Sequence, residues 1–291
     1  TDTFVIIVDA TDPVVASSIS FSPDTGTVGD GITNTGSIVL SGVAEADAQV
    51  TVLRNGVAVG TATVDGAGNW NFDFSGSPLG PGTHDLTTQV TDVAGNTSPL
   101  SSVLTVVVDT TLPGAPTLVA IAPDTGTAGD WLTSNGQLTF TGTTPDPGVQ
   151  IHLSLDGSVV GTSVADGAGN WSFDYTGTNL AEGTYTVTAE AETYAGNLSP
   201  ASAAQLLVID QSAPTGTVVS TITTDTNIAG DGVTSDDTLT ATGSAEGNAL
   251  ITLLVDGVSV GTTTAAAGGA WSIATTLVAD GSDDLTTTAQ D

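Results

Sequence analysis

Apolar and polar residues alternate along short segments that are separated by Gly-, Asn- and Asp-containing turns. Trp70, Phe72 and Phe74 recur with a period of two, which places all three on one face of a β-strand. Residues 50–53 alternate in the same way and precede Asn55-Gly56, a dipeptide that favours a tight β-hairpin turn. No segment of useful length has a helical period, so the pattern predicts an all-β protein.

The same pattern recurs at a spacing of about 100 residues, which indicates tandem repeats. The segment Pro-Asp-Thr-Gly-Thr stands at 23–27 and again at 123–127, and the turn Asp-Gly-Ala-Gly-Asn-Trp stands at 65–70 and at 166–171. Trp271 marks a third copy. Strands are expected in the first copy near 14–21, 37–44, 48–54, 57–64, 69–74, 83–92 and 101–109. This number of short strands in about 100 residues predicts a tandem array of immunoglobulin-like antiparallel β-sandwiches.

An apolar run that ends in Asp closes the first and second copies and is followed by a proline. Such runs end at Asp109 and Asp210, and a matching run ends at Asp9. We therefore expect residues 1–9 to be the last strand of a preceding repeat, 10–109 and 110–210 to be complete repeats, and 211–291 to be a repeat that ends before its last strand.

The charge balance excludes several classes of function. The 291 residues include 32 Asp and Glu but a single Lys or Arg, for a formal net charge of −31. A chain with one cationic side chain cannot neutralise phosphates, which argues against nucleic-acid binding and against attraction to an anionic membrane. No apolar run approaches the length of a membrane span, and the absence of Cys excludes disulfides and thiolate metal sites.

The recurring motifs resemble those of the bacterial Ig-like domains in giant repetitive adhesins exported by type I secretion. The resemblance lies in four segments: Val-Asp-Thr-Thr-x-Pro at 108–113, Pro-Asp-Thr-Gly-x-x-Gly-Asp at 23–30, the Asp-Gly-x-Gly-Asn-Trp turn, and Thr-Asp-x-Ala-Gly-Asn at 91–96. It implies an extracellular stalk on the bacterial cell surface that is stiffened by Ca²⁺ at the junctions between repeats. It also implies that a separate terminal region performs specific binding.

Strand direction independently predicts that acidic loops gather at the repeat ends. In a sandwich of seven antiparallel strands, the first loop lies beside the end of the last strand, so Asp24, Asp30 and Asp109 are expected to converge. Ca²⁺ is bound by six to eight oxygens from carboxylates and carbonyls on flexible loops. The alternative is that these aspartates only cap turns through nearby backbone amides. The candidate Ca²⁺ ligands are Asp9, Asp24, Asp30, Asp65, Asp92, Asp109, Asp124, Asp130, Asp210, Asp225 and Asp231.

Two departures from the repeat weaken the case for Ca²⁺ ligands at the corresponding ends of the second and third copies. The second copy has Glu192-Thr193 where the first has Thr91-Asp92, and the third copy has lost the Asp-Gly-x-Gly-Asn turn. For Asp65 and Asp166, a role in turn formation alone is as well supported as metal binding.

The sequence offers little for catalysis. The two histidines, His84 and His152, do not occupy matching positions, and no Ser/His/Asp set recurs, so we do not expect an enzyme. Trp131 is the one tryptophan that the repeat does not demand, because Gly31 and Gly232 match it. It is expected to pack against the third copy or, alternatively, to face solvent and stack on a sugar.

The sequence is consistent with three functions. The first is a Ca²⁺-stiffened extender segment of a secreted surface adhesin, which serves attachment or biofilm formation and has neighbouring repeats as its partners. The second is a sheath or filament protein whose copies join by strand donation from residues 1–8. The third is a carbohydrate- or protein-binding Ig-like module.

Overall fold

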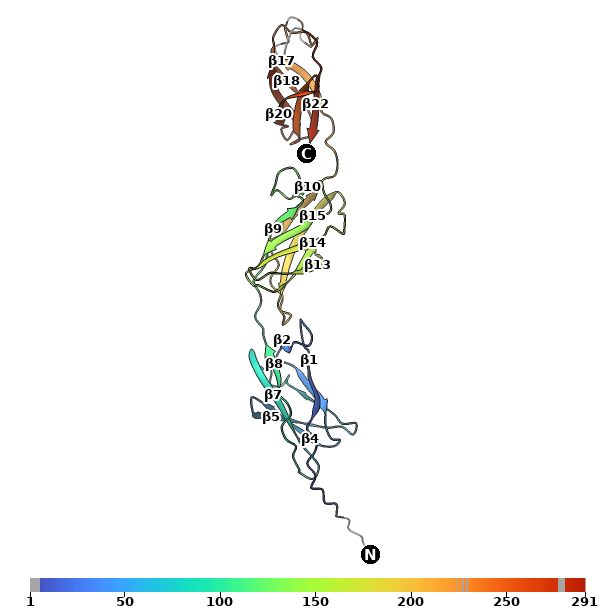
Figure 1. The fold of residues 1–291 in the computed structure, drawn as a ribbon, viewed down its shortest axis with the longest axis vertical. Helices are drawn as coiled ribbons and strands as arrows, with labels where there is room; N and C mark the ends of the chain where they lie inside the picture. The colour runs from blue at the N-terminus through green and yellow to red at the C-terminus, as the bar shows by residue number, and fades with distance from the viewer. Residues whose placement is uncertain (1–5, 224, 227, 229, 277–280, 291) are drawn as a thin grey trace. The chain divides into compact units, whose positions relative to one another are not determined.

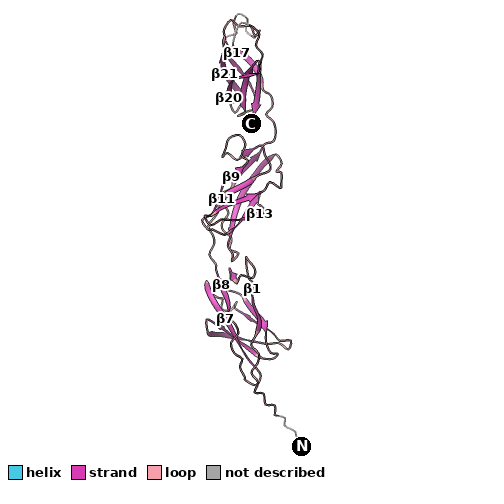
Figure 2. Cartoon of the chain, in the orientation of Figure 1, coloured by secondary structure: helices cyan, strands magenta, loops and turns pink. Residues whose placement is uncertain are grey.

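The computed structural model describes residues 6–223, 225–226, 228, 230–276 and 281–290. All regular structure in these residues is β (Figure 2). Figure 1 shows the course of the chain with labels on many of its strands. The chain divides into two compact units. One comprises Thr1–Ala122, Gln137–Thr178 and Thr184–Leu207, and the other comprises Pro123–Gly136, Asn179–Gly183 and Val208–Asp291.

The first repeat is a sandwich of a three-stranded and a five-stranded sheet. The smaller sheet has the order β1-β3-β6 and the larger has the order β2-β8-β7-β4-β5. The strands are β1 (Ser17–Ser22), β2 (Ile32–Thr33), β3 (Val39–Val43), β4 (Gln49–Arg54), β5 (Val57–Thr63), β6 (Asn69–Asp73), β7 (Gly82–Thr91) and β8 (Leu104–Val108).

The second repeat has the same topology, strand for strand. Its sheets have the orders β14-β11-β9 and β10-β16-β15-β12-β13. The strands are β9 (Thr117–Ala122), β10 (Leu132–Thr133), β11 (Thr139–Thr143), β12 (Gln150–Leu155), β13 (Ser158–Val164), β14 (Asn170–Asp174), β15 (Gly183–Glu192) and β16 (Gln205–Ile209).

The described residues of the third repeat form two three-stranded sheets, β17-β18-β21 and β20-β19-β22. The strands are β17 (Val218–Thr223), β18 (Thr238–Ser244), β19 (Leu250–Val255), β20 (Val258–Thr264), β21 (Ala270–Thr276) and β22 (Leu285–Gln290). Of the strand expected over 1–9, residues 1–5 lie outside the described residues, and residues 6–9 form no strand.

The alternation of apolar residues sets the core of each sandwich. Trp70 and Phe74 are buried in the first repeat, and Phe72 is partly buried against the same cluster, as their period of two predicts. Trp171 and Trp271 are buried at the matching places. The Asn55-Gly56 hairpin also forms as predicted, with positive φ at both residues, which is the geometry of a type I′ turn.

One element differs from the all-antiparallel expectation. β2, inside the first loop, pairs in parallel with the last strand β8, with Ile32 opposite Val107 and Thr33 opposite Val108. The first loop was expected to lie beside the end of the last strand. It instead contributes a short strand that pairs with β8. The Thr33 carbonyl then accepts a hydrogen bond of 2.9 Å from the Asp109 amide, which ties the loop to the start of the linker.

Each sandwich also depends on a glycine that lies against the core tryptophan. Gly142 on β11 pairs with Trp171 on β14, and a Cβ added to Gly142 would overlap the Thr117 carbonyl and the Trp171 ring. Gly42 and Gly243 meet Trp70 and Trp271 in the same way. The tryptophan ring thus fills the space that a side chain on the neighbouring strand would otherwise take.

We expect Gly142→Ala to destabilise the second repeat by about 1–3 kcal/mol, because the added methyl group overpacks the core. Denaturant unfolding followed by tryptophan fluorescence measures the loss. Gly167→Ala is the matched control, since a Cβ there meets nothing within 4 Å. Equal stability of the two variants would contradict this account of the glycine.

Candidate metal centre at the repeat ends

The first loop of each repeat holds two aspartates in backbone turns. Asp24 Oδ2 accepts a hydrogen bond from the Gly29 amide at 2.7 Å, and Asp30 Oδ1 accepts one from the Ile32 amide at 2.8 Å. Asp124 and Asp130 make the same two bonds in the second repeat, and Asp225 and Asp231 make them in the third. The loop is therefore built locally and repeats as a unit.

One carboxylate oxygen of this loop is buried without a hydrogen-bond partner. It is Oδ1 of Asp24, and the equivalent oxygens of Asp124 and Asp225 are also buried and unpartnered. A buried polar atom without a partner costs free energy, so its recurrence at one position in three repeats calls for a physical reason. The sequence placed these residues in the candidate set, but nothing in it distinguished this oxygen from the others.

The linker aspartates form a second repeated feature. Oδ1 of Asp109 accepts a hydrogen bond from the amide two residues further on, and Asp9 and Asp210 do the same. The Asp109 carbonyl accepts a hydrogen bond of 2.7 Å from Asn197 Nδ2, and the Asp9 carbonyl accepts one of 3.3 Å from Asn96 Nδ2. The Ala-Gly-Asn turn of a repeat thus binds the linker that leads into that repeat.

Asp65 and Asp166 also cap turns. Asp65 Oδ1 accepts hydrogen bonds from the amides of Ala67 and Asn69. The Asn69 amide is the main reason that the pKa of Asp65 lies below its ordinary value, and the Asn170 amide lowers the pKa of Asp166 in the same way. Ala266 takes this place in the third repeat, where the backbone bonds of the turn remain. The turn therefore forms without the carboxylate.

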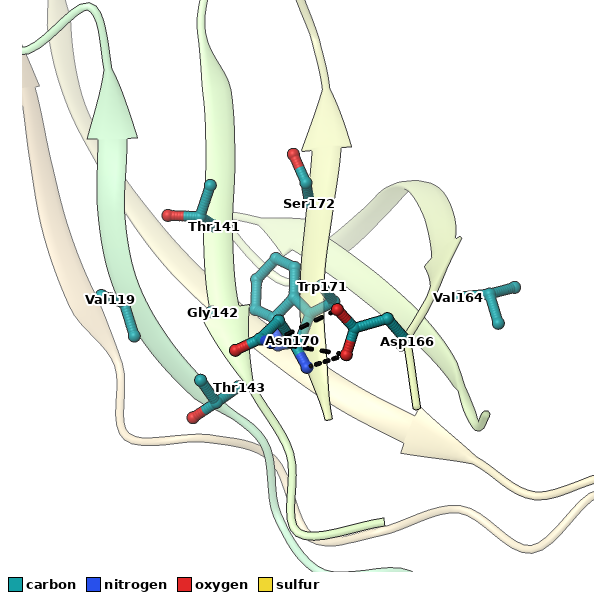
Figure 3. Close-up of a pocket in the computed structure, with 9 residues that line it drawn as sticks. All are labelled: Val119, Thr141, Gly142, Thr143, Val164, Asp166, Asn170, Trp171 and Ser172. Atoms are coloured by element: carbon teal, nitrogen blue, oxygen red, sulfur yellow. Dashed lines mark hydrogen bonds between the residues drawn. The ribbon is translucent and has the colours of Figure 1, made fainter. Parts of the chain in front are cut away.

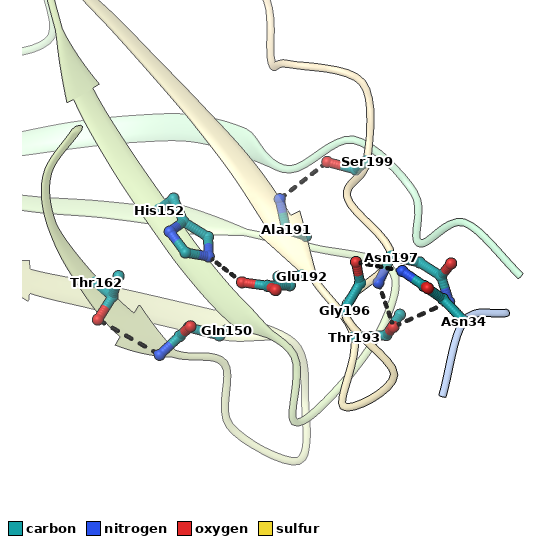
Figure 4. Close-up of polar contacts among 10 residues, drawn as sticks. All are labelled: Asn34, Gln150, His152, Thr162, Ala191, Glu192, Thr193, Gly196, Asn197 and Ser199. Carbon is teal, nitrogen blue, oxygen red and sulfur yellow. Dashed lines mark hydrogen bonds and ion pairs between the residues drawn. The ribbon is translucent and has the colours of Figure 1, made fainter. Parts of the chain in front are cut away.

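Asp92 and its counterpart Thr193 show how the second repeat replaces an acidic residue. Asp92 binds Asn96 through both oxygens, at 2.8 Å to the backbone amide and 2.8 Å to the side-chain amide. The side-chain bond to Asn96 is the main cause of the lowered pKa of Asp92. Thr193 Oγ1 accepts the equivalent bonds from Asn197 at 3.1 and 3.3 Å (Figure 4).

The neighbouring departure, Glu192, has a partner of its own. Glu192 Oε2 lies 2.6 Å from His152 Nε2, on adjacent strands β15 and β12 (Figure 4). Thr91 stands at this place in the first repeat. The unmatched histidine thus pairs with the unmatched glutamate, and both belong to the sheet surface.

All eleven candidate ligands accept a hydrogen bond from a backbone amide: Asp9, Asp24, Asp30, Asp65, Asp92, Asp109, Asp124, Asp130, Asp210, Asp225 and Asp231. Within the described part of the chain, no three His, Cys, Asp or Glu side chains form a group that could hold a metal ion. Asp24, Asp30 and Asp109 therefore do not form a three-carboxylate site by themselves. A cation at these loops would need backbone carbonyls or water as additional ligands.

The second repeat also has an open pocket that sequence reasoning missed (Figure 3). It has a volume of about 560 Å³ and is lined by strands β9, β11 and β14, with the Asp166–Asn170 turn at one side. Trp171 lines it with a buried indole Nε1 that has no hydrogen-bond partner, but Trp70 and Trp271 share this property. The unpartnered indole is thus a feature of the fold and does not distinguish this pocket.

Trp131 is 5% exposed, so it does not offer a solvent-facing surface for sugar stacking. Its φ of 63° is in the left-handed region, as are the φ values of Gly31 and Gly232 at the same place.

In the described residues there is no helix long and apolar enough to cross a membrane.

The lowered pKa values predict an acid-dependent loss of stability. When the folded-state pKa is depressed, the carboxylate stabilises the fold above its ordinary pKa of 3.8, and this contribution is lost as the pH falls through the lower folded value. Asp92→Asn should therefore weaken the pH dependence of unfolding below about pH 4. Thr193→Asp should strengthen it in the second repeat. Denaturant midpoints measured across this range test both, and pH profiles identical to that of the unmodified chain would contradict the assignment.

Similar folds occur among solved structures. The fibronectin(III)-like modules of Clostridium thermocellum CbhA are 16% identical with a TM-score of 0.45, over 66% of this chain and 93% of that one. A structure from a 1.5-MDa bacterial ice-binding adhesin is 23% identical with a TM-score of 0.33, over 95% of this chain and 97% of that one. A tetra-tandem repeat from the extending region of a large adhesion protein is 22% identical with a TM-score of 0.25, over 97% and 74%. No curated protein matches the chain.

Family models match most of the sequence. A bacterial Ig-like domain model matches residues 10–110 and again 112–211, and a second bacterial Ig-like model, group 3, matches residues 169–257. These matches follow the two eight-stranded sandwiches described above and extend into the third repeat. The chain belongs to the bacterial Ig-like domain family.

Proposed function

We propose that this chain is an extender segment of a large repetitive adhesin on the bacterial cell surface, where it projects a distal binding region for attachment or biofilm formation. The observation that carries the proposal is the regularity of the repeats. The first two sandwiches correspond strand for strand, and the loops at their ends repeat the same hydrogen bonds. A module that binds a specific ligand would be expected to carry an unrepeated insertion or an exposed aromatic cluster, and the one unrepeated tryptophan is buried.

Calcium is the second part of the proposal. Ca²⁺ prefers carboxylate and carbonyl oxygens, and the buried unpartnered Oδ1 of Asp24, Asp124 and Asp225 is an oxygen of this kind. Asp30, Asp130 and Asp231 of the same loops and the linker residues Asp109 and Asp210 are further candidate ligands. With a net charge of −31, the chain has almost no cationic side chains that could neutralise these carboxylates. Bound Ca²⁺ would supply that positive charge and link the loop to the linker.

We expect Ca²⁺ to raise the melting temperature of the chain and a chelator to lower it, because a ligand that binds the folded state stabilises it by about 2.7 kcal/mol at 100 times its dissociation constant. The triple variant Asp24→Asn, Asp124→Asn, Asp225→Asn should lose most of this shift. Asp85→Asn, which removes a carboxylate from the exposed side of β7, should keep it. Melting curves that are the same in Ca²⁺ and in chelator would refute the calcium part of the proposal.

We also expect Ca²⁺ to change the shape of the array more than the fold of each repeat. The change is expected at the linker that follows the second repeat, since linked domains move relative to one another unless their interface is large. Small-angle X-ray scattering should give a larger maximum dimension in Ca²⁺ than in chelator, with unchanged circular dichroism. Equal maximum dimensions in the two conditions would contradict a stiffening role.

A further inference from the structure

The first two repeats make a direct contact that involves no carboxylate. The Thr-Gly-Thr loop at 25–27 of the first repeat lies against the Tyr-Ala-Gly turn at 194–196 of the second. The Thr27 amide donates a hydrogen bond to the Tyr194 carbonyl at 3.0 Å, and Thr25 Oγ1 donates one to the Ala195 carbonyl at 2.6 Å. Asn34 Nδ2 donates a third, at 3.1 Å, to the Gly196 carbonyl (Figure 4). Three successive carbonyls of one repeat are thus bound by donors of the other.

Two glycines allow this close approach. Gly26 and Gly196 both have positive φ, and their backbones meet. A Cβ on Gly26 would overlap the carbonyl of Tyr194, and a Cβ on Gly196 would crowd the backbone of Gly26. By contrast, Gly29 in the same loop and Gly95, which matches Gly196 in the first repeat, have positive φ but no neighbour within 4 Å of an added Cβ.

Both sides of the contact are held by bonds within their own repeat. The Thr25 hydroxyl accepts a hydrogen bond from the Asn34 amide at 2.8 Å, so its proton is directed to the Ala195 carbonyl. Thr125 and Thr226 accept the same bond in their own repeats. The turn of the second repeat is closed by a bond of 3.0 Å from the Thr193 amide to the Asn197 carbonyl, and the Asp92–Asn96 turn of the first repeat is closed in the same way. The two surfaces therefore do not need each other in order to form.

We propose that this loop and turn form a clasp that orients the first two repeats without a bound ion. The turn of one repeat serves as the binding surface for the Thr-Gly-Thr loop of another Ig-like repeat. Neutral donors bind neutral carbonyls here, so the clasp depends on neither Ca²⁺ nor ionic strength. The Asp92–Asn96 turn of the first repeat has the same backbone bonds, an open Gly95 and an exposed Val93, and thus presents the same surface to such a loop. The clasp is independent of the calcium proposal, because it uses different atoms of the junction.

The test uses the absence of cysteine from the chain. Asn71→Cys on β6 and Ser172→Cys on β14 allow one spin label to be attached to each of the two repeats, at matching exposed positions. Pulsed electron resonance in chelator should give a narrow distance distribution for the parent chain and for Gly29→Ala, and loss of that narrow distribution for Gly26→Ala. Both substitutions impose the same left-handed strain, and only one of them faces the second repeat.

Two outcomes would overturn the clasp: an equally narrow distribution in Gly26→Ala, or a parent distribution that is broad in chelator and narrow only in Ca²⁺. If Gly26→Ala unfolds the first repeat, Gly196→Ala tests the same contact from the second repeat, with Gly95→Ala as its control. A melting temperature that does not respond to Ca²⁺ would refute calcium binding and leave the clasp intact. The two proposals therefore fail separately.

Discussion

The shortage of positive charge is the constraint on which the loops of this protein depend. With 32 acidic residues and a single Lys or Arg, the chain cannot stabilise its carboxylates by ion pairs with cationic side chains. Backbone amides take that role, and every candidate aspartate caps a turn through one. At Asp24, Oδ2 binds the Gly29 amide, but Oδ1 is buried without a hydrogen-bond partner. The same constraint therefore shapes the turns, and the unpartnered oxygen is the observation behind the calcium proposal.

The repeats tolerate the loss of individual carboxylates because the backbone carries most of each turn. Ala266 replaces the aspartate of the Asp-Gly-Ala-Gly-Asn turn, and Thr193 replaces Asp92, yet both turns keep their backbone bonds. What persists in the first two repeats is the bond from Asn96 or Asn197 to the linker carbonyl. The position of the linker thus depends on an amide side chain and not on charge.

The sequence predicted the strands well because each long strand repeats its alternation of apolar and polar residues several times. The hairpins were equally clear, because Asn55-Gly56 recurs as Asp156-Gly157 and Asp256-Gly257, and such dipeptides favour tight hairpin turns. β2 was missed because two residues are too few to show a period, and its partner β8 lies more than 70 residues away. The contact of Thr25 with Ala195 was missed for a related reason: it joins neutral groups 170 residues apart, and no local pattern marks such a pair. Side-chain convergence of the aspartates could not be derived from strand direction, which fixes the end of the sandwich but not the distance between two carboxylates.

The parallel pairing of β2 with β8 has a mechanical consequence. β8 continues into the linker, so tension applied through the linker pulls this strand along its own axis. Its hydrogen bonds to β2 on one side and β7 on the other run across that axis. Such bonds are loaded in shear and must break together, whereas a strand peeled from an edge loses its bonds one at a time. A two-residue strand inside a loop thus places β8 in the interior of a sheet, where hydrogen bonds on both sides would resist its extension.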